Sequence, residues 1–336
     1  MQHDGLLQAL IIALAWALAF ALALALPSPA RAEPIEVILP ENGNLQYLAF
    51  WVAVGSGDVD VKLRIAETPG DTRKLVDAGQ AQLLVLPPPI FFQLLGDGVP
   101  LVAVGNLLRN DPIDLIVKRD VARARKLDGT LPLKERLTRL GGLKLGVAPG
   151  PLPRLRTLYH SVGLPPPEVV TLMGQEQNGA LADGKVDALY AHTPYLERAL
   201  MKQDCVIVVN QAGGEVPELA SRQIHMLVAN EKMLRERRAT VDKMLAAVAH
   251  AERLIHHDRK AALAALFRAL PPRDAEARAL AEKLFDLYLN AIPEDPAVSV
   301  EGLKGALAFY PASKRPPDLS HVDWPKHVLT PTRPPQ

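Results

Sequence analysis

The sequence has very little cysteine and no surplus of charge. Its one cysteine among 336 residues is Cys205, so no disulfide can form within the chain and the fold must rest on its own core. The 38 lysines and arginines balance 37 aspartates and glutamates, which argues against a nucleic-acid partner because such proteins usually carry a basic surplus. Cys205 opens the apolar run Cys205–Val209, which predicts a buried strand and a structural cysteine.

The motifs of common enzyme classes are also missing. The chain has no Gly-x-Ser-x-Gly, no His-Glu-x-x-His and no phosphate-binding glycine loop. Gly55-Ser56-Gly57 lacks the third glycine of a dinucleotide site. The neighbours His256 and His257 point about 100° apart on a helix and do not form a metal site. We therefore predict no catalytic residue, no metal and no cofactor.

The N-terminus carries a long apolar run without charge, Leu6–Leu26, followed by Ala30-Arg31-Ala32. Signal peptidase cleaves after two small residues that are separated by one residue of any type, and Ala30-Arg31-Ala32 has this pattern. We predict that residues 1–32 are a signal peptide, cleaved after Ala32, and that the mature protein is periplasmic. The apolar segment is also long enough for an uncleaved membrane anchor. Because no cysteine lies near the cleavage site, acylation as a lipoprotein is excluded.

After residue 33, short apolar runs alternate with helical patterns, which predicts an α/β fold with largely parallel sheets. The expected strands are Ile35–Leu39, Val61–Ile65, Leu83–Leu86, Val99–Val104 and Ile113–Val117. A helix is expected at Thr72–Ala78, ended by Gly79. The C-terminal third predicts helices at Val241–His257, with Thr240 as N-cap, and at Ala275–Ala291, with Asp274 as N-cap. Seven prolines in residues 311–336 predict a tail that wraps the surface or is loose.

An internal repeat predicts two lobes of similar design. A helix end, a glycine turn and a strand occur at residues 75–85 and again at 180–190, and Pro89 and Pro194 follow at the same spacing. A second pair aligns residues 37–41 with 146–150. Ligands of open α/β sheets bind beyond the carboxyl ends of the strands, so four segments are expected to face a common cleft.

These four segments supply most of the candidate ligand-binding residues. After the first strand, Glu41, Asn42 and Asn44 are candidates for binding or for shaping the turn. Pro88 and Gly150 lie at the second and third segments. The fourth supplies Tyr190, for ring stacking or packing, and His192 and Thr193, for binding or structure. Arg154 and Arg156 either clamp a carboxylate or lie on a solvated helix face.

The order and spacing of these features resemble the ABC-importer substrate-binding proteins of the nitrate/sulfonate/taurine family, which includes thiamine-precursor binders. The resemblance rests on Gly70–Gly79, on Ala180–Ala188 with Pro194, and on the apolar helix after residues 231–234. It implies a type II periplasmic-binding-protein fold, two α/β lobes that close by hinge bending. The expected lobes are residues 33–111 with 223–310, and residues 112–222. Asn110 and Asp111, at the first crossing, would touch the ligand or shape the hinge.

The resemblance implies a monomeric protein that captures a small organic ligand and delivers it to an ABC permease in the inner membrane. Two alternatives use the same fold: an enzyme similar to those of thiamine-pyrimidine synthesis, and a sensory module that presents a ligand to a receptor. One departure concerns the ligand. Family members that bind oxyanions often have Ser or Thr at the helix starts of the cleft, where this chain has Pro88-Pro89 and Pro151-Leu152-Pro153. Proline removes an N–H donor, which argues against an inorganic oxyanion.

Overall fold

The computed structural model describes residues 33–80, 83–309 and 316–329, and the predicted signal peptide lies outside this part of the chain. The fold is contained in one compact unit, Ile35–Gln336. Within the described ranges, no helix combines the length and the apolar character needed to cross a membrane.

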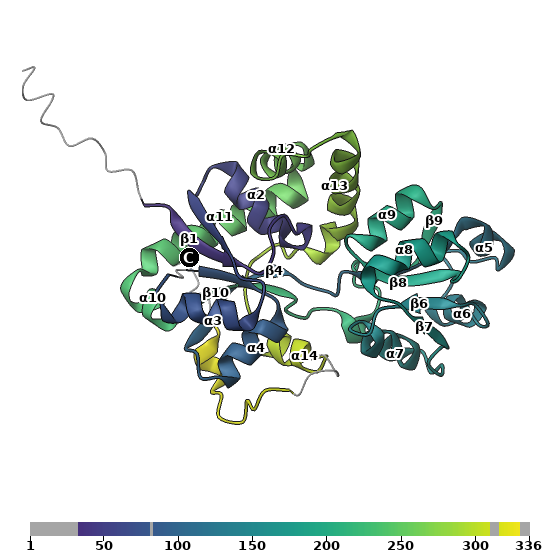
Figure 1. Ribbon diagram of the computed structural model, residues 1–336, viewed down its shortest axis with the longest axis horizontal. Coiled ribbons are helices and arrows are strands. Elements are labelled where there is room, and N and C mark those ends of the chain that lie inside the picture. Colours follow the sequence, from purple (N-terminus) through teal and green to yellow (C-terminus); the bar gives the residue numbers. More distant parts are fainter. Residues whose placement is uncertain (1–32, 81–82, 310–315, 330–336) are drawn as a thin grey trace, which may run out of the picture. The chain divides into compact units, whose positions relative to one another are not determined.

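Two five-stranded sheets with the same arrangement form the framework (Figure 1). The first sheet has the order β2-β1-β3-β10-β4, and the second has the order β7-β6-β8-β5-β9. In each sheet the fourth strand in this order, β10 or β5, is antiparallel to its neighbours and the others are parallel. The strands are β1 Ile35–Leu39, β2 Val61–Ile65, β3 Leu83–Leu86, β4 Leu101–Leu108, β5 Ile113–Lys118, β6 Leu145–Val147, β7 Val169–Thr171, β8 Ala188–His192, β9 Cys205–Val209 and β10 His225–Asn230. The predicted α/β fold with two similar, mainly parallel sheets is confirmed.

The chain crosses between the sheets twice, from β4 to β5 and from β9 to β10. Each antiparallel strand is the first strand after a crossing. The second sheet, β5 to β9, is built from the single continuous segment between the two crossings. The predicted limits of the two lobes stay a prediction, since Ile35–Gln336 behaves as one compact unit.

Helices cover both faces of each sheet. On the first sheet, one apolar cluster joins it to α2 Leu48–Ser56, α11 Arg238–His257 and α12 Arg259–Ala269. A second cluster, on the opposite face, includes α3 Pro69–Asp77, α4 Pro88–Gly96 and α14 Val300–Leu307. The second sheet packs on one face against α6 Leu133–Arg139 and α7 Leu152–Ser161, and on the other against α8 Gly174–Ala182 and α9 Tyr195–Lys202. The remaining helices are α5 Arg119–Ala124, α10 Glu231–Glu236 and α13 Ala275–Tyr288, with short 3-10 turns at Leu45–Tyr47, Pro217–Leu219, Leu289–Ala291 and Trp324–His327.

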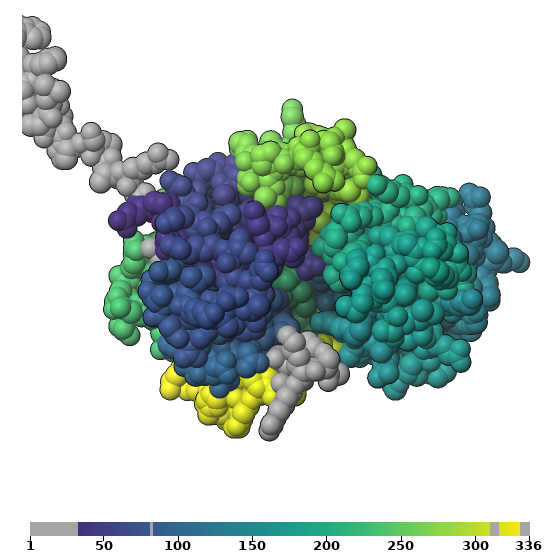
Figure 2. All heavy atoms as spheres, in the orientation of Figure 1, coloured from purple at the N-terminus to yellow at the C-terminus, as the bar shows by residue number. Residues whose placement is uncertain are grey.

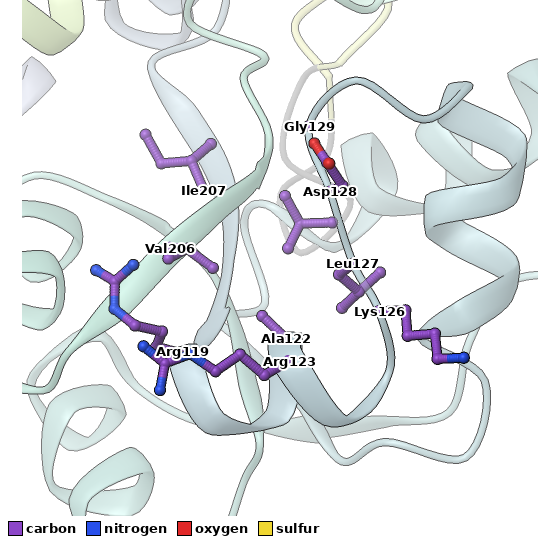
Figure 3. Close-up of a pocket in the computed structure, with 10 residues that line it drawn as sticks. Arg119, Ala122, Arg123, Lys126, Leu127, Asp128, Gly129, Val206 and Ile207 are labelled. Carbon is purple, nitrogen blue, oxygen red and sulfur yellow. The ribbon is translucent and has the colours of Figure 1, made fainter.

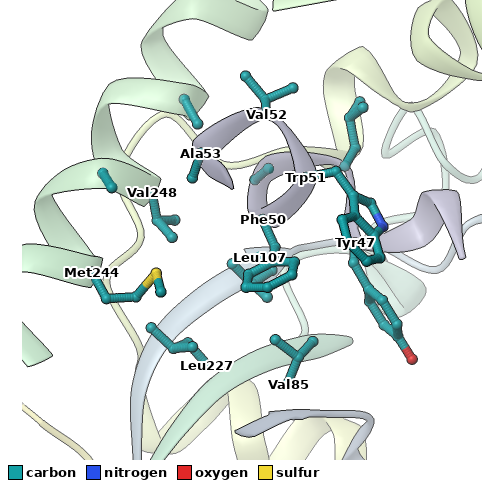
Figure 4. Packing of buried hydrophobic residues seen from close by; sticks show 14 of the residues in the cluster. Tyr47, Phe50, Trp51, Val52, Ala53, Val85, Leu107, Leu227, Met244 and Val248 are labelled. Atoms are coloured by element: carbon teal, nitrogen blue, oxygen red, sulfur yellow. The ribbon is translucent and has the colours of Figure 1, made fainter. Parts of the chain in front are cut away.

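The largest apolar cluster surrounds α2, whose residues Leu48–Ala53 are all buried (Figure 4). Phe50 and Trp51 pack edge to face with 5.1 Å between ring centroids, and the indole Nε1 of Trp51 donates to the backbone oxygen of Asn44 at 2.8 Å. This hydrogen bond holds the loop after β1 against the core. The loop therefore has a fixed position where it reaches the site described below.

Gly55 allows α2 to approach α12 closely. A Cβ atom at Gly55 would lie 1.8 Å from the backbone oxygen of Ala265. We expect Gly55→Ala to lower the free energy of unfolding by about 2 kcal/mol or more, because the two helices must separate. Chemical denaturation measures this change. Gly179→Ala is the control: a Cβ there meets nothing within 4 Å, so an equal loss in both variants would contradict the close-contact explanation.

Several boundary predictions are wrong in detail; the helix predicted at Thr72–Ala78, for example, runs from Pro69 to Asp77. The strand predicted from Val99 begins at Leu101. The N–H of Val99 instead donates a 2.9 Å hydrogen bond to the backbone oxygen of Leu94 and so belongs to the C-terminal end of α4. Thr240 is not an N-cap, since α11 already begins at Arg238. The last predicted helix ends as an α-helix at Tyr288 and continues as a 3-10 turn, while its predicted N-cap, Asp274, is confirmed by a 2.7 Å hydrogen bond from the N–H of Ala277.

The described part of the proline-rich tail packs on the first sheet. The Trp324 ring lies 6.0 Å from that of Phe92, edge to face, and Val328 forms an isolated bridge to Ala103 of β4. Of the two expectations for this tail, wrapping the surface holds for residues 316–329.

Candidate functional site

A cavity of about 500 Å³ lies where chain from both sheets meets α13. One wall follows the carboxyl end of β1, in the first sheet, and another follows the carboxyl end of β8, in the second. The lining residues are Glu41, Gly43, Asn44, Leu45, Gln46, His192, Thr193, Pro194, Tyr195, Glu197, Arg198, Arg273, Ala277, Leu280 and Ala281. Figure 2 shows the purple segment after β1 beside the teal surface of the second sheet. We call this the β1–β8 cavity.

Four predicted binding residues line the β1–β8 cavity: Glu41, Asn44, His192 and Thr193. Both polar atoms of the Asn44 side chain form hydrogen bonds. Its Oδ1 accepts from the N–H of Gln46 at 2.8 Å, and its Nδ2 donates to Oε2 of Glu41 at 3.3 Å. Asn44 thus caps the first helical turn and orients the Glu41 carboxylate. The neighbouring Asn42 lines a separate cavity between this loop and α12.

His192 is a neutral imidazole at the end of β8. Burial lowers its pKa below the ordinary 6.5, and the nearby charge of Arg154 acts in the same direction. Its Nδ1 is hydrogen-bonded to the backbone oxygen of Thr193, which assigns the proton to Nδ1 and the acceptor role to Nε2. The ring also packs edge to face with Tyr195, 5.8 Å between centroids.

Glu197 is the most unusual residue of the cavity wall. It is only 4% exposed, and its Oε1 accepts from the hydroxyl of Thr193 at 2.6 Å. The other oxygen, Oε2, is buried without a hydrogen-bond partner in the described part of the chain. Burial raises the pKa of this carboxyl above its usual 4.5. An unpartnered buried carboxylate oxygen is costly, so a group that fills the cavity and donates to it would be stabilised.

Behind the cavity lies a second neutral histidine, His225 of β10. Burial lowers its pKa to about 3, and its Nε2 lies 2.6 Å from Oε1 of Gln46. The ring of Tyr47 meets it edge to face at 4.9 Å. Because neutral His225 donates to Gln46, the side chain of this cavity-lining glutamine has a fixed orientation.

The crossing residues hold the fold together and do not line the cavity. Asn110 has a φ of 61°; its Nδ2 donates to the oxygen of Ala212 at 3.1 Å and its Oδ1 accepts from the N–H of Ser221 at 2.9 Å. It therefore ties the first crossing to the second. Asp111 is buried between the guanidinium groups of Arg154 and Arg222.

The remaining candidates also lie away from the β1–β8 cavity. Tyr190 is fully buried and its hydroxyl donates to Gln211. Pro88 is buried in the first turn of α4. Gly150 is exposed before α7, and its oxygen accepts from Arg154 at 3.3 Å.

The sequence did not identify Gln46, Glu197 or the contribution of α13. Glu197 had one local signal, a carboxylate four residues after Thr193 on a helix whose neighbouring positions, Leu196 and Ala199, are buried. Arg273, Ala277, Leu280 and Ala281 come from a segment about 80 residues downstream, and nothing in their local pattern points to the cavity.

A second hollow of about 500 Å³ lies on the second sheet, between α5, the loop after it and β9 (Figure 3). It holds three basic residues, Arg119, Arg123 and Lys126. Arg119 is paired with Asp204 at 2.6 Å. All of its lining comes from the second sheet and its helices, so the hollow lacks the contact with both sheets that distinguishes the β1–β8 cavity.

Comparison with known proteins identifies the family of this chain. The family model described as NMT1/THI5 like matches residues 56–262. No curated protein matches the chain.

Several solved structures resemble it over most of its length. The periplasmic aliphatic sulphonate binding protein SsuA from Escherichia coli is 16% identical, covers 88% of this chain and 99% of its own, and has a TM-score of 0.58. The periplasmic sulfonate-binding protein SsuA from Methylobacillus flagellatus is 13% identical, with 89% and 92% covered and a TM-score of 0.59. An ABC transporter protein from Parabacteroides distasonis is 17% identical, with 85% and 96% covered and a TM-score of 0.56. At these identities the likeness shows the fold, which is the expected two-lobed fold of periplasmic binding proteins.

Proposed function

Because the chain belongs to the NMT1/THI5-like family, we propose that it is a solute-binding protein that captures a small organic molecule and delivers it to an ABC importer. The observation that carries this proposal is the β1–β8 cavity, which is lined from both sheets at the carboxyl ends of their strands. The sulphonate-binding proteins from Escherichia coli and Methylobacillus flagellatus share the fold, which supports a role in binding.

The proposed mechanism is capture by closure. A ligand in the cavity contacts Glu41 and Asn44 on one side and His192 and Thr193 on the other. A molecule that bridges both walls binds the closed arrangement better than an open one and shifts the population toward it. No bond is made or broken in this mechanism. The protein acts as a monomer in the periplasm and its partner is a permease of the inner membrane.

The test is a binding screen by thermal shift, with amines, amidines, aromatic acids, alkylsulfonates and nitrate. A ligand at 100 times its Kd adds about 2.7 kcal/mol to the free energy of unfolding. We expect one chemical class to stabilise the protein, and mass spectrometry to recover the compound unaltered. Recovery of a chemically changed compound would show an enzyme, contrary to the proposal.

His192→Ala is expected to weaken the affinity for that compound about tenfold, because the variant removes the Nε2 acceptor and opens the cavity wall. Isothermal titration calorimetry measures the change. The control is His160→Ala, at the exposed end of α7. Unchanged affinity in His192→Ala would move the binding site away from the β1–β8 cavity.

A further inference from the structure

The helix starts at the carboxyl ends of the strands offer few free N–H groups. At α4, Pro87, Pro88 and Pro89 carry no N–H, and the first donor, Ile90, is bonded to the oxygen of Pro87 at 3.1 Å. At α7, Pro151 and Pro153 lack an N–H and only Leu152 between them keeps one, while the N–H of Arg154 returns to the oxygen of Pro151 at 2.9 Å. Anions bind helix starts through several free N–H groups, so both starts are poor sites for an oxyanion.

The two helix starts that border the β1–β8 cavity are occupied by the chain's own side chains. At the 3-10 turn Leu45–Tyr47, Oδ1 of the N-cap Asn44 accepts a hydrogen bond from the N–H of Gln46. At α9, Pro194 is the N-cap and lacks an N–H. The carboxyl of Glu197 accepts hydrogen bonds from the backbone N–H of the same residue and from the hydroxyl of Thr193. A negative group therefore already sits where an anionic ligand would bind.

The cavity instead presents acceptors. Glu197 contributes the unpartnered, buried Oε2, Glu41 adds a second, exposed carboxylate, and His192 offers Nε2 as an acceptor because its Nδ1 is bonded to Thr193. The arginines of the wall, Arg198 and Arg273, are exposed, and Nε of Arg273 lies 3.2 Å from the carboxylate of Asp274. Acceptors thus lie at depth and cations lie at the rim.

We infer that the ligand is an organic nitrogen base, an amine or an amidine, whose N–H groups are received by Glu197 at depth and by Glu41 at the entrance. This inference rests on the proposed function and names the class of its ligand. A cationic donor offsets the cost of burying the Glu197 carboxylate and forms charge-assisted hydrogen bonds with it. A sulfonate or nitrate would meet that carboxylate as a like charge and would find no free helix start.

The test is ligand capture with the full chain purified from the cells that produce it. The protein is incubated with an extract of small molecules from those cells and washed, and the released compounds are identified by mass spectrometry. Glu197→Gln keeps the size of the side chain and replaces a carboxylate oxygen by an N–H donor. We expect the wild-type protein to capture an amine or amidine, and Glu197→Gln to bind that compound at least tenfold more weakly by calorimetry. Glu168→Gln is the matched control, an exposed carboxylate before β7, at the opposite end of its sheet.

The outcomes separate the two proposals. Capture of a nitrogen base that depends on Glu197 and not on Glu168 supports both. Capture of an anion without N–H donors, or equal affinity in the wild-type protein and Glu197→Gln, overturns the nitrogen-base ligand and leaves the binding function standing. If no small molecule is captured, the binding function fails and the inference fails with it. Circular dichroism of Glu197→Gln confirms that any loss of affinity occurs in a folded protein.

Discussion

Replacing Asp111 by alanine is expected to lower the free energy of unfolding by about 3–5 kcal/mol, which is the usual effect of removing one partner of a buried ion pair. The Asp111 side chain is 3% exposed, between Arg222, itself 4% exposed, and Arg154, whose Nε lies 2.5 Å from the carboxylate. The variant leaves two guanidinium groups without their anion. Burial already lowers the pKa of Arg222 to about 10, which indicates how poorly this position solvates a cation.

The effect reaches beyond one contact because Asp111 lies on the first crossing and Arg222 on the second. The centroid of the Phe309 ring also lies 4.3 Å from the guanidinium carbon of Arg222, so the turn after α14 is held at the same point. Urea denaturation measures the change. Asp286→Ala is the control, because it breaks an exposed pair with Arg259 at 2.8 Å, for which we expect about 1 kcal/mol or less. A similarly small loss for Asp111→Ala would show that water replaces the missing carboxylate.

Raising the pH from 7 to 9 is expected to destabilise the protein by about 2–3 kcal/mol through Glu252, a fully buried residue of α11. Neither carboxyl oxygen has a hydrogen-bond partner among the described residues. Burial raises the pKa of Glu252 from 4.5 to about 9; the charge of Asp295 adds to this rise, and Arg109 and Arg253 oppose it. The folded protein thus keeps a proton that the unfolded chain loses above about pH 4.5.

The sign follows from proton linkage. Between pH 4.5 and 9 the folded state binds more protons at Glu252, so its stabilising effect is complete below pH 4.5 and is lost as the pH rises, by at most about 1.4 kcal/mol per pH unit. His225 acts in the opposite direction, because its pKa is lowered from 6.5 to about 3 and stability is lost as the pH falls through that window. Measurements above pH 7 therefore avoid the contribution of His225.

Glu252→Gln isolates the contribution of Glu252. The amide has the same size and does not ionise, so we expect the free energy of unfolding of this variant to fall less than that of the wild-type protein between pH 7 and 9. Glu197, whose pKa burial also raises, is the same in both proteins, so the comparison of their pH dependence isolates Glu252. Equal slopes in the two proteins would show that Glu252 is solvated or paired in solution.

The sequence by itself determined the fold. The repeated helix, glycine and strand predicted two similar sheets because each part acts locally: Gly79 and Gly184 take φ values of +65° and +70° that suit glycine, and the apolar runs become buried strands. The same repeat located Glu41, Asn44, His192 and Thr193, since residues after a strand's carboxyl end are placed by the strand itself.

Only the tertiary structure decided which of those ends meet and which side chains are left for a ligand. Tyr190 and His192 lie on one face of β8, yet Tyr190 is covered by the core of the second sheet, while His192, at the end of the strand, reaches the cavity. Asp111 pairs with Arg222, 111 residues away in the sequence. Helix α13 lines a cavity whose other walls are the loop after β1 and the chain at the end of β8. Such contacts depend on how distant segments pack, and no local pattern records them.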